Sequence, residues 1–413
     1  MKFRRYESGD EEGIVSVMNK SFSTFREWGL TPEKWLGYEV DPGFKRENAF
    51  VAEEDGKIVG HVQVVERELH FGKFVRTAGI ANVCTDPEYR KMGMATDLMR
   101  FVMEQVSKEY CLAGLDTGYG SSAHRIYRRV GFSPFHFFAR LSAEAWDARR
   151  SLDKLKRFSE GMDEVQPFER NQEEAMKKIY AENAEITMGV HRRSDGYWEE
   201  KLFKRNSWQT FFYRELRPDD VLVFPDRGYA YLDWDEQRKA LHIRECLAHP
   251  NDFGALASLY GKAIEQHQDA HEITISIPEG DPAASYLLGD FYQFREPGSY
   301  MMSITNLRDF LNQVGPLAGA GSGVAELRVY NDVTQLEPVN VNLRDFTPTE
   351  KAADVRVGLH QRTLLRMIAG LESPERAAEA GLIEVSGISS YLMTSLRSLF
   401  YLRRFHLWPP DHW

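Results

Sequence analysis

The chain has few cysteines and no long apolar run, and both absences limit what kind of protein it can be. Its 413 residues include only three cysteines, Cys84, Cys111 and Cys246, and their spacing fits neither a disulfide framework nor a metal site. No apolar run approaches the roughly 20 residues that span a bilayer, and the basic N-terminus lacks the apolar core of a secretion signal. We therefore expect a cytoplasmic protein with no membrane span and no bound metal.

Positively charged residues are also fewer than negatively charged ones. The chain has 52 lysines and arginines against 62 aspartates and glutamates, which gives a net charge of -10. This balance argues against a nucleic-acid partner and mildly favours cationic ones. The turn around residues 90–95, described next, is neither a Walker phosphate loop nor the three-glycine dinucleotide fingerprint. A chain of this length predicts two or three domains.

The most informative feature that is present lies between residues 78 and 107. A small, partly apolar run over 78–85 predicts a strand, and apolar residues at helical spacing predict a helix over about 91–107. Between them, Arg90, Gly93 and Ala95 follow the pattern Arg-x-x-Gly-x-Ala. Small residues at a helix N-terminus leave the main-chain amides open to an anion such as a pyrophosphate. The pattern alone is a weak signal, because an ordinary strand-to-helix turn can also carry it.

Around this turn, residues 1–150 alternate between strand and helix signals. Strands are expected over 48–53 and 57–65, joined by a type I′ turn at Asp55-Gly56. A strand over 111–116 precedes a helix over 121–130, which Gly131 closes, and a single aromatic-rich strand is expected over 132–141. The sum is a mixed α/β domain of ordinary size.

The same order of elements returns over residues 151–298, which predicts an internal duplication. At the position equivalent to the opening motif, Cys246-Leu247-Ala248-His249-Pro250 runs directly into a helix that Asp252 caps. The second copy has no Arg-x-x-Gly-x-Ala and should lack a phosphate cradle. A third unit is expected over 299–413, and its aromatic-rich end should dock on the protein, since free termini are usually polar.

Two motifs of the first segment together resemble the GCN5-related N-acetyltransferases, or GNAT proteins. The first is Val83-x-Thr85-x-Pro87-x-x-Arg90-x-x-Gly93-x-Ala95, and the second runs from Ser122 through Tyr127 to Gly131-Phe132. The whole chain resembles one branch, the Eis (enhanced intracellular survival) family. That resemblance implies an α/β (α+β) chain with two tandem GNAT folds, the second degenerate, followed by a domain like sterol carrier proteins.

The resemblance also implies a site and a reaction. Pantetheine would lie along Val83, Cys84 and Thr85, and the pyrophosphate on the amides that follow. The residues matched to the acetyl-CoA site are Val83, Cys84, Thr85, Arg90, Lys91, Met92, Gly93, Met94, Ala95, Thr96, Ser122 and Ala123. Tyr127 matches the general acid, and the C-terminal carboxylate, here on Trp413, matches the general base. The acceptor would be a cationic amine, either an aminoglycoside- or polyamine-like molecule or a lysine, attacked directly without a covalent intermediate.

Alternatives accompany these assignments. Cys84 could act as a thiol nucleophile, although no His/Asp arrangement points to that role, and a buried small residue beside the cofactor is the simpler interpretation. The carrier-like domain could serve a lipid- or protein-binding module whose transferase is vestigial. The family resemblance also implies a homo-oligomer, with a hexamer as one form.

Overall fold

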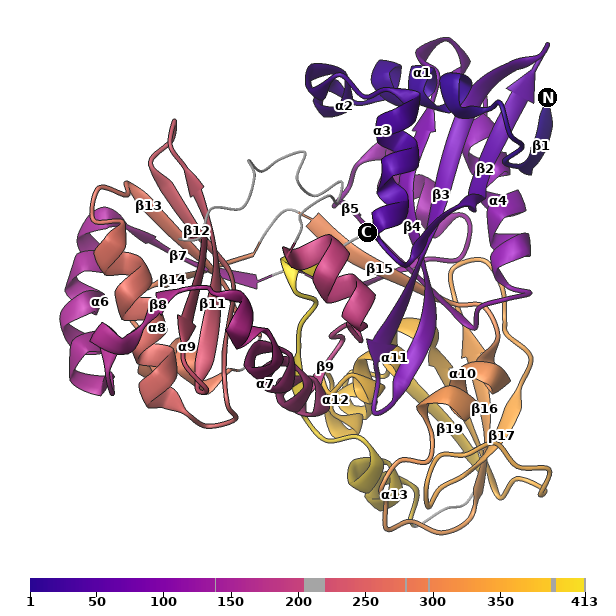
Figure 1. Cartoon of the computed structure of the whole chain (residues 1–413). Coiled ribbons are helices and arrows are strands. Elements are labelled where there is room, and N and C mark those ends of the chain that lie inside the picture. Colours follow the sequence, from indigo (N-terminus) through magenta and orange to yellow (C-terminus); the bar gives the residue numbers. More distant parts are fainter. Residues whose placement is uncertain (138, 204–219, 279–280, 296–297, 388–390, 412–413) are drawn as a thin grey trace.

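The computed structural model describes residues 1–137, 139–203, 220–278, 281–295, 298–387 and 391–411. These residues form two seven-stranded sheets, a four-stranded sheet and a two-stranded pair. Figure 1 shows the two large sheets in separate units, with the third unit beside the first and the end of the chain running back between the two large sheets. None of the described helices is long and apolar enough to cross a membrane.

The first sheet has the order β1-β2-β3-β4-β5-β15-β6. Its strands are β1 (Lys2–Arg5), β2 (Phe44–Glu54), β3 (Lys57–His70), β4 (Phe74–Thr85), β5 (Leu112–Gly118), β6 (Ser133–His136) and β15 (Gly298–Ile304). Its helices are α1 (Glu11–Ser21), α2 (Ser23–Trp28), α3 (Pro32–Leu36), α4 (Met94–Val106) and α5 (Ser122–Arg128). Alternate residues of β2 enter two different cores, as the two-residue period of a strand requires. Phe50 and Ala52 pack in the core that contains α4, whereas Ala49 and Val51 pack in the core that contains α1 and α3.

Local sequence explains the turns of this sheet. Asp55 and Gly56, between β2 and β3, both have positive φ, +49° and +75°, which confirms the predicted type I′ hairpin turn. Gly131 closes α5 with φ +97°, as the sequence predicted. Thr31 caps α3 by accepting a hydrogen bond from the Lys34 amide.

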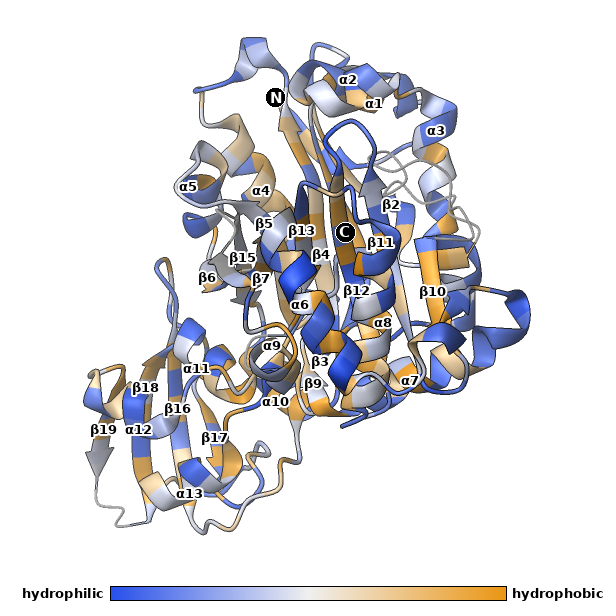
Figure 2. Cartoon of the chain, turned by 90° about the vertical axis from the view of Figure 1, so that its left-hand side faces the viewer, coloured by the Kyte–Doolittle hydropathy of each residue, from blue (hydrophilic) through white to orange (hydrophobic). Residues whose placement is uncertain are grey.

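The second sheet has the order β14-β7-β13-β12-β11-β10-β8. Its strands are β7 (Ala139–Glu144), β8 (Gln166–Pro167), β10 (Val221–Phe224), β11 (Gly228–Asp235), β12 (Ala240–Ala248), β13 (Glu272–Ser276) and β14 (Tyr292–Arg295). Its helices are α6 (Ala145–Phe158), α7 (Glu173–Ile186), α8 (Phe253–Gln266) and α9 (Pro282–Tyr286). Figure 2 shows α6 as largely hydrophilic on the side facing the viewer, while Ala148, Leu152 and Leu155 enter the core of this sheet. The strand expected around 210–216 lies outside the described residues.

The two large sheets exchange strands. The single strand expected over 132–141 is wrong, because the chain divides there into β6, which pairs in the first sheet, and β7, which pairs with β13 and β14 of the second. In return, β15 crosses back and inserts between β5 and β6. The first crossing, between His136 and Ala139, precedes the boundary expected at residue 150, and the return strand begins at Gly298, near the expected start of the third unit, but belongs to the first sheet. The division into three units stays a prediction, and these strands bind its first two parts together.

The third unit has a sheet with the order β17-β16-β18-β19. Its strands are β16 (Val324–Tyr330), β17 (Val339–Asn342), β18 (Val355–His360) and β19 (Ile383–Gly387), and its helices are α10 (Leu307–Val314), α11 (Gln361–Ile368), α12 (Pro374–Glu379) and α13 (Leu392–Leu399). Leu69, Phe71 and Phe135 of the first unit belong to the same apolar cluster as this sheet. The third unit therefore shares a core with the first.

The end of the chain docks, as predicted. The strand β20 (Arg404–Phe405) pairs in parallel with β9 (Thr187–Met188) of the second unit. Phe405, Leu407 and Trp408 are buried. Apolar burial of this kind outweighs the tendency of a terminus to fray.

Candidate active site

The sheet opens at the point where the motif begins. β4 and β5 pair in parallel only over Thr77–Gly79 and Leu112–Gly114, and β5 then continues with β15 as its partner as far as Gly118. Beyond Gly79, the edge of β4 that faces β5 has no strand partner within the described residues. A main-chain bulge at Asn82, with φ +53°, bends β4 in this region. An extended ligand can therefore hydrogen-bond along Val83, Cys84 and Thr85.

The turn after β4 is fixed by Asp86. Its amide donates to the carbonyl of Val59 at 2.8 Å, and its carboxylate accepts from Lys20 Nζ at 2.7 Å and from the Glu88 amide at 3.1 Å. Lys20 and the local amide hold the pKa of the Asp86 carboxyl below its usual range against the opposing effect of burial. These contacts set the direction in which the chain enters the next helix.

Helix α4 begins without a capping side chain. Its N-cap is Gly93, whose φ of +88° is left-handed and favours glycine. In the described part of the chain, the amides of residues 91–95 donate to no other group. Free amides and the positive end of the helix dipole together favour a phosphate. The residues therefore fit the pyrophosphate of an acyl-CoA.

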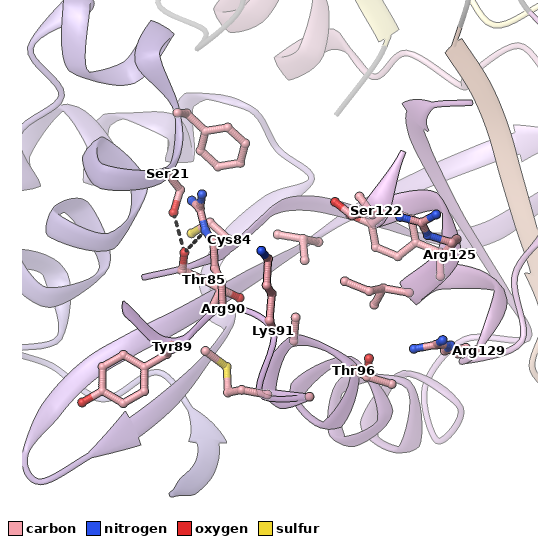
Figure 3. Close-up of a pocket in the computed structure, with 18 residues that line it drawn as sticks. Ser21, Cys84, Thr85, Tyr89, Arg90, Lys91, Thr96, Ser122, Arg125 and Arg129 are labelled. Atoms are coloured by element: carbon pink, nitrogen blue, oxygen red, sulfur yellow. Dashed lines mark hydrogen bonds between the residues drawn. The ribbon is translucent and has the colours of Figure 1, made fainter. Parts of the chain in front are cut away.

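These elements surround one cavity of about 500 Å³, shown in Figure 3. Every residue predicted to hold the cofactor lines it except Met92, whose side chain is 73% exposed. The cavity also includes Tyr127 and six residues that the sequence prediction missed. The missed residues are Ser21, Phe22, Tyr89, Arg125, Ile126 and Arg129.

Some of the missed residues carried a sequence signal and others did not. Arg125 on α5 and Arg129 at its C-cap follow Ser122 at helical spacing, so they share its face, and this periodicity could have indicated them. Ser21, at the end of α1, donates from Oγ to the Thr85 carbonyl at 3.0 Å. Nothing in the sequence links positions 64 residues apart, so only the fold brings Ser21 here.

Tyr127 lies on α5, a helix capped by Ser121, whose Oγ accepts from the His124 amide at 3.1 Å. Its side chain is 7% exposed. Burial raises the pKa of Tyr127 well above its usual value, and the nearby Cys84 adds to the effect. The phenol therefore keeps its proton at neutral pH and can donate it.

Cys84 faces the cavity as a neutral thiol. Burial raises its pKa to about 12, despite opposing contributions from His61, Ser21 and Arg90. A thiol nucleophile needs its thiolate, so this geometry favours the interpretation of Cys84 as a packed residue beside the cofactor.

The predicted base, Trp413, lies outside the described residues, but the chain just before it is tightly held. Asp411 is buried and accepts from Arg193 Nε at 2.8 Å and from Tyr180 Oη at 3.1 Å. Its main-chain carbonyl accepts from Arg67 Nε of β3 at 3.2 Å. The last described residue therefore connects the first and second units.

Further buried charges complete this junction. Arg67 forms a two-pronged ion pair with Asp41 at 2.7 and 3.0 Å, and Asp41 also accepts from Lys201 Nζ at 2.9 Å. Arg193 pairs with Glu245. Since such pairs lose solvation on burial, they favour one geometry more than they stabilise the fold. The junction therefore specifies where the tail binds.

The equivalent place in the second unit is closed. The N-cap of α8 is Asp252, whose carboxylate accepts from the Ala255 amide at 2.9 Å and pairs with Arg227 at 2.6 Å. The cavity beside it has a volume of about 30 Å³, and Trp408 is one of its walls. The expectation that this copy lacks a phosphate cradle agrees with this geometry.

Comparison with known proteins identifies the domain family of the first unit. Residues 2–135 match the acetyltransferase (GNAT) domain family. No curated protein sequence matches the chain at a significant level.

Solved structures match over the whole chain. A GCN5-related N-acetyltransferase from Kribbella flavida superposes with a TM-score of 0.71 at 16% identity, over 100% of this chain and 98% of its own. One from Anabaena variabilis gives 0.72 at 16% identity, over 98% and 100%. Eis1 from Mycobacterium abscessus gives 0.64 at 14% identity, over 98% and 99%. At these identities the likeness shows a shared fold of the whole chain. Residues 2–135 therefore form a GNAT acetyltransferase domain, and the chain is an acyl-CoA-dependent N-acetyltransferase.

Proposed function

We propose that this enzyme belongs to the Eis branch and moves an acetyl group from acetyl-CoA to an amine of a cationic acceptor. The observation that carries the proposal is the single cavity of about 500 Å³ that joins the open β4 edge, the uncapped start of α4 and Tyr127. The fold shared with Eis1 over nearly the full length of both chains supports the choice of branch.

The acceptor class comes from the resemblance to the Eis family, and the charge of the chain is compatible with it. The net charge of -10 favours a cationic partner, which an aminoglycoside- or polyamine-like molecule or a lysine side chain would provide. Such an amine is mostly protonated at neutral pH and must lose a proton before it attacks. The carboxylate of Trp413, at the end of the chain, is the proposed general base.

In the transfer, the amine nitrogen forms a bond to the thioester carbonyl carbon and the bond from that carbon to sulfur breaks. The proton from the amine passes to the base, and Tyr127 donates its own proton to the leaving thiolate. Tyr127 is protonated at neutral pH and so has a proton to give, while its raised pKa makes it a weaker acid than a free tyrosine. No covalent enzyme intermediate is needed, which agrees with the neutral Cys84 thiol.

The contacts of Asp411 support the role of the tail. A terminal carboxylate on a free tail would sample many positions, whereas proton transfer needs a fixed one. The ties from Arg193, Tyr180 and Arg67 hold the chain two residues before its end. They restrict where the last carboxylate can go.

We propose two further properties from the resemblance. The four-stranded unit over 299–413 is a carrier-like domain, and the protein assembles as a homo-oligomer, with a hexamer expected. Sedimentation velocity checks the second proposal directly, since a monomer of 47.6 kDa and a hexamer sediment very differently.

The catalytic proposal is tested by changing the end of the chain. Deleting Trp413, or adding a tag after it, should lower kcat about a hundredfold or more, the usual contribution of a general base, and leave the Kd for CoA nearly unchanged. An N-terminal tag is the control and should do little. A C-terminally extended enzyme with normal kcat contradicts the carboxylate as base, and failure to bind CoA at all favours the binding-module alternative.

A further inference from the structure

The cavity is strongly cationic. Four of its lining residues, Arg90, Lys91, Arg125 and Arg129, carry positive charge, and none of the described lining residues is acidic. The protein as a whole is acidic, with a net charge of -10. A local excess of positive charge in an acidic protein indicates a site for an anion.

These four side chains have no carboxylate partner in the described part of the chain, where many other surface arginines do. Arg128, between Arg125 and Arg129 in sequence, pairs with Asp332 at 2.7 Å. Arg125 and Arg129 are exposed at the cavity and make no ion pair with any described residue. Their charge is therefore available to a ligand.

The four cations form two groups. Arg90 and Lys91 belong to the turn before α4, where Arg90 Nε donates to the Thr85 carbonyl at 3.2 Å and so stays beside the free amides. Arg125 projects from α5 and Arg129 from the C-cap residue that follows it, one helical turn further on. Figure 3 shows them on the opposite side of the cavity from Arg90 and Lys91.

Two groups of cations suit a ligand with two separate anionic groups. CoA has a pyrophosphate with about two negative charges, and a 3′-phosphate on the ribose that carries about -1.5 to -2 at pH 7, as other phosphate monoesters do. The amides of α4, with Arg90 and Lys91, account for the pyrophosphate. The pair on α5 is left for the second group, and guanidinium groups bind phosphate oxygens in a two-pronged manner.

We propose that Arg125 and Arg129 bind the 3′-phosphate of CoA and so make this enzyme select 3′-phosphorylated CoA thioesters over their dephospho forms. The proposal rests on the acyl-CoA-dependent activity and assigns the phosphate specificity of that same cavity. It assigns both arginines to binding, with no part in the proton transfers.

The test is calorimetric titration of the full chain with CoA and with 3′-dephospho-CoA, which needs no acceptor and no turnover. The wild-type protein should bind CoA at least about tenfold more tightly, in line with the strength of charge-assisted hydrogen bonds. The double variant Arg125→Gln/Arg129→Gln should bind both ligands with nearly the same Kd, close to the wild-type value for dephospho-CoA.

A matched control removes one positive charge from the same helix. Arg128→Gln should keep the wild-type preference, because Arg128 pairs with Asp332 and does not line the cavity. Equal binding of the two ligands by the wild-type protein overturns the proposal. So does an equal loss for both ligands in the double variant, which would assign the arginines to the pyrophosphate. Absence of binding by any form contradicts the acyl-CoA activity itself.

Discussion

The two large sheets of this chain carry the same opening, but only the first leads to a ligand cavity. β4 and β5 pair over three residues before they separate, and β12 and β13 pair over Ala240–Ile243 and then separate in the same way. The first opening has a cavity of about 500 Å³, the second one of about 30 Å³. The fold provides the opening, and particular residues decide whether it stays free.

Two differences close the second opening. Where Gly93 leaves the amides of α4 free, the Asp252 carboxylate caps α8 and occupies the place that favours an anion. Trp408 of the tail, 2% exposed, forms one wall of the small cavity that remains. The tail therefore contacts both units, since Trp408 lines the second opening and Asp411 lies at the junction with the first.

The largest expected effect concerns the two helices that follow β5 and β13. Tyr127 on α5 is buried, whereas Tyr286 on α9 is 67% exposed. Tyr127→Phe should lower kcat by about a hundredfold or more, the contribution of a positioned acid, with little change in the Kd for CoA. Tyr286→Phe is the control and should leave kcat unchanged. Steady-state kinetics checks both, and a normal kcat in Tyr127→Phe would remove this residue as the acid.

Trp408→Ala should open the second cavity at a large cost in stability. Truncating a buried tryptophan typically lowers the free energy of unfolding by about 3–5 kcal/mol, and chemical denaturation measures it. Trp146→Ala is a matched control, because Trp146 is 69% exposed. We expect the variant still to bind one CoA per chain, since Asp252 continues to cap α8. A second equivalent in titration would show that Trp408 alone closes this copy.

Gly93→Asp should make the first copy resemble the second. A Cβ at Gly93 meets nothing closer than 3.9 Å, so the effect comes from the left-handed φ and from the added charge. Loss of two charge-assisted hydrogen bonds to the pyrophosphate would weaken CoA binding about a hundredfold or more. Gly93→Asn has a similar shape without the charge and should bind CoA more tightly than Gly93→Asp. Equal Kd values for the two variants would argue against an anion at this helix start.

The smallest expected effect is one of pH. His61 lies across from Cys84 on β3, while Ala230 lies across from Cys246. Burial lowers the pKa of His61 to about 4, so between about pH 6.5 and 4 the unfolded chain binds a proton that the folded chain does not. As the pH is lowered through this window, the free energy of unfolding should therefore decrease, by up to about 1.4 kcal/mol per pH unit.

His61→Ala, which places alanine where the second sheet has Ala230, should reduce this slope by the share of one histidine and leave the contribution of other buried histidines such as His191. Unfolding measured at several pH values between 7 and 4 provides the slope. If the slope is the same in the variant and the wild-type protein, His61 does not carry the effect.

Much of the site could be predicted from the sequence because its determinants are local. The strand-to-helix turn, the positive φ of Gly93 and the Gly131 cap each depend on a few neighbouring residues. The exchange of β7 and β15 could not be predicted, because strand pairing depends on contacts between residues more than a hundred positions apart. The sequence between β6 and β7 also contains no turn-forming residues, such as a pair of glycines, that would predict the end of one strand and the start of another.

The sequence by itself determined most of the order of elements, the strand-to-helix turn at Gly93 and the absence of that motif from the second unit, since short segments encode them through helical period, turn residues and capping. Only the tertiary structure decided which strands complete each sheet, that Ser21 lines the first cavity, and that Trp408 is a wall of the second. Those features arise from the burial of apolar surface and the pairing of charges between distant segments, which no local pattern specifies.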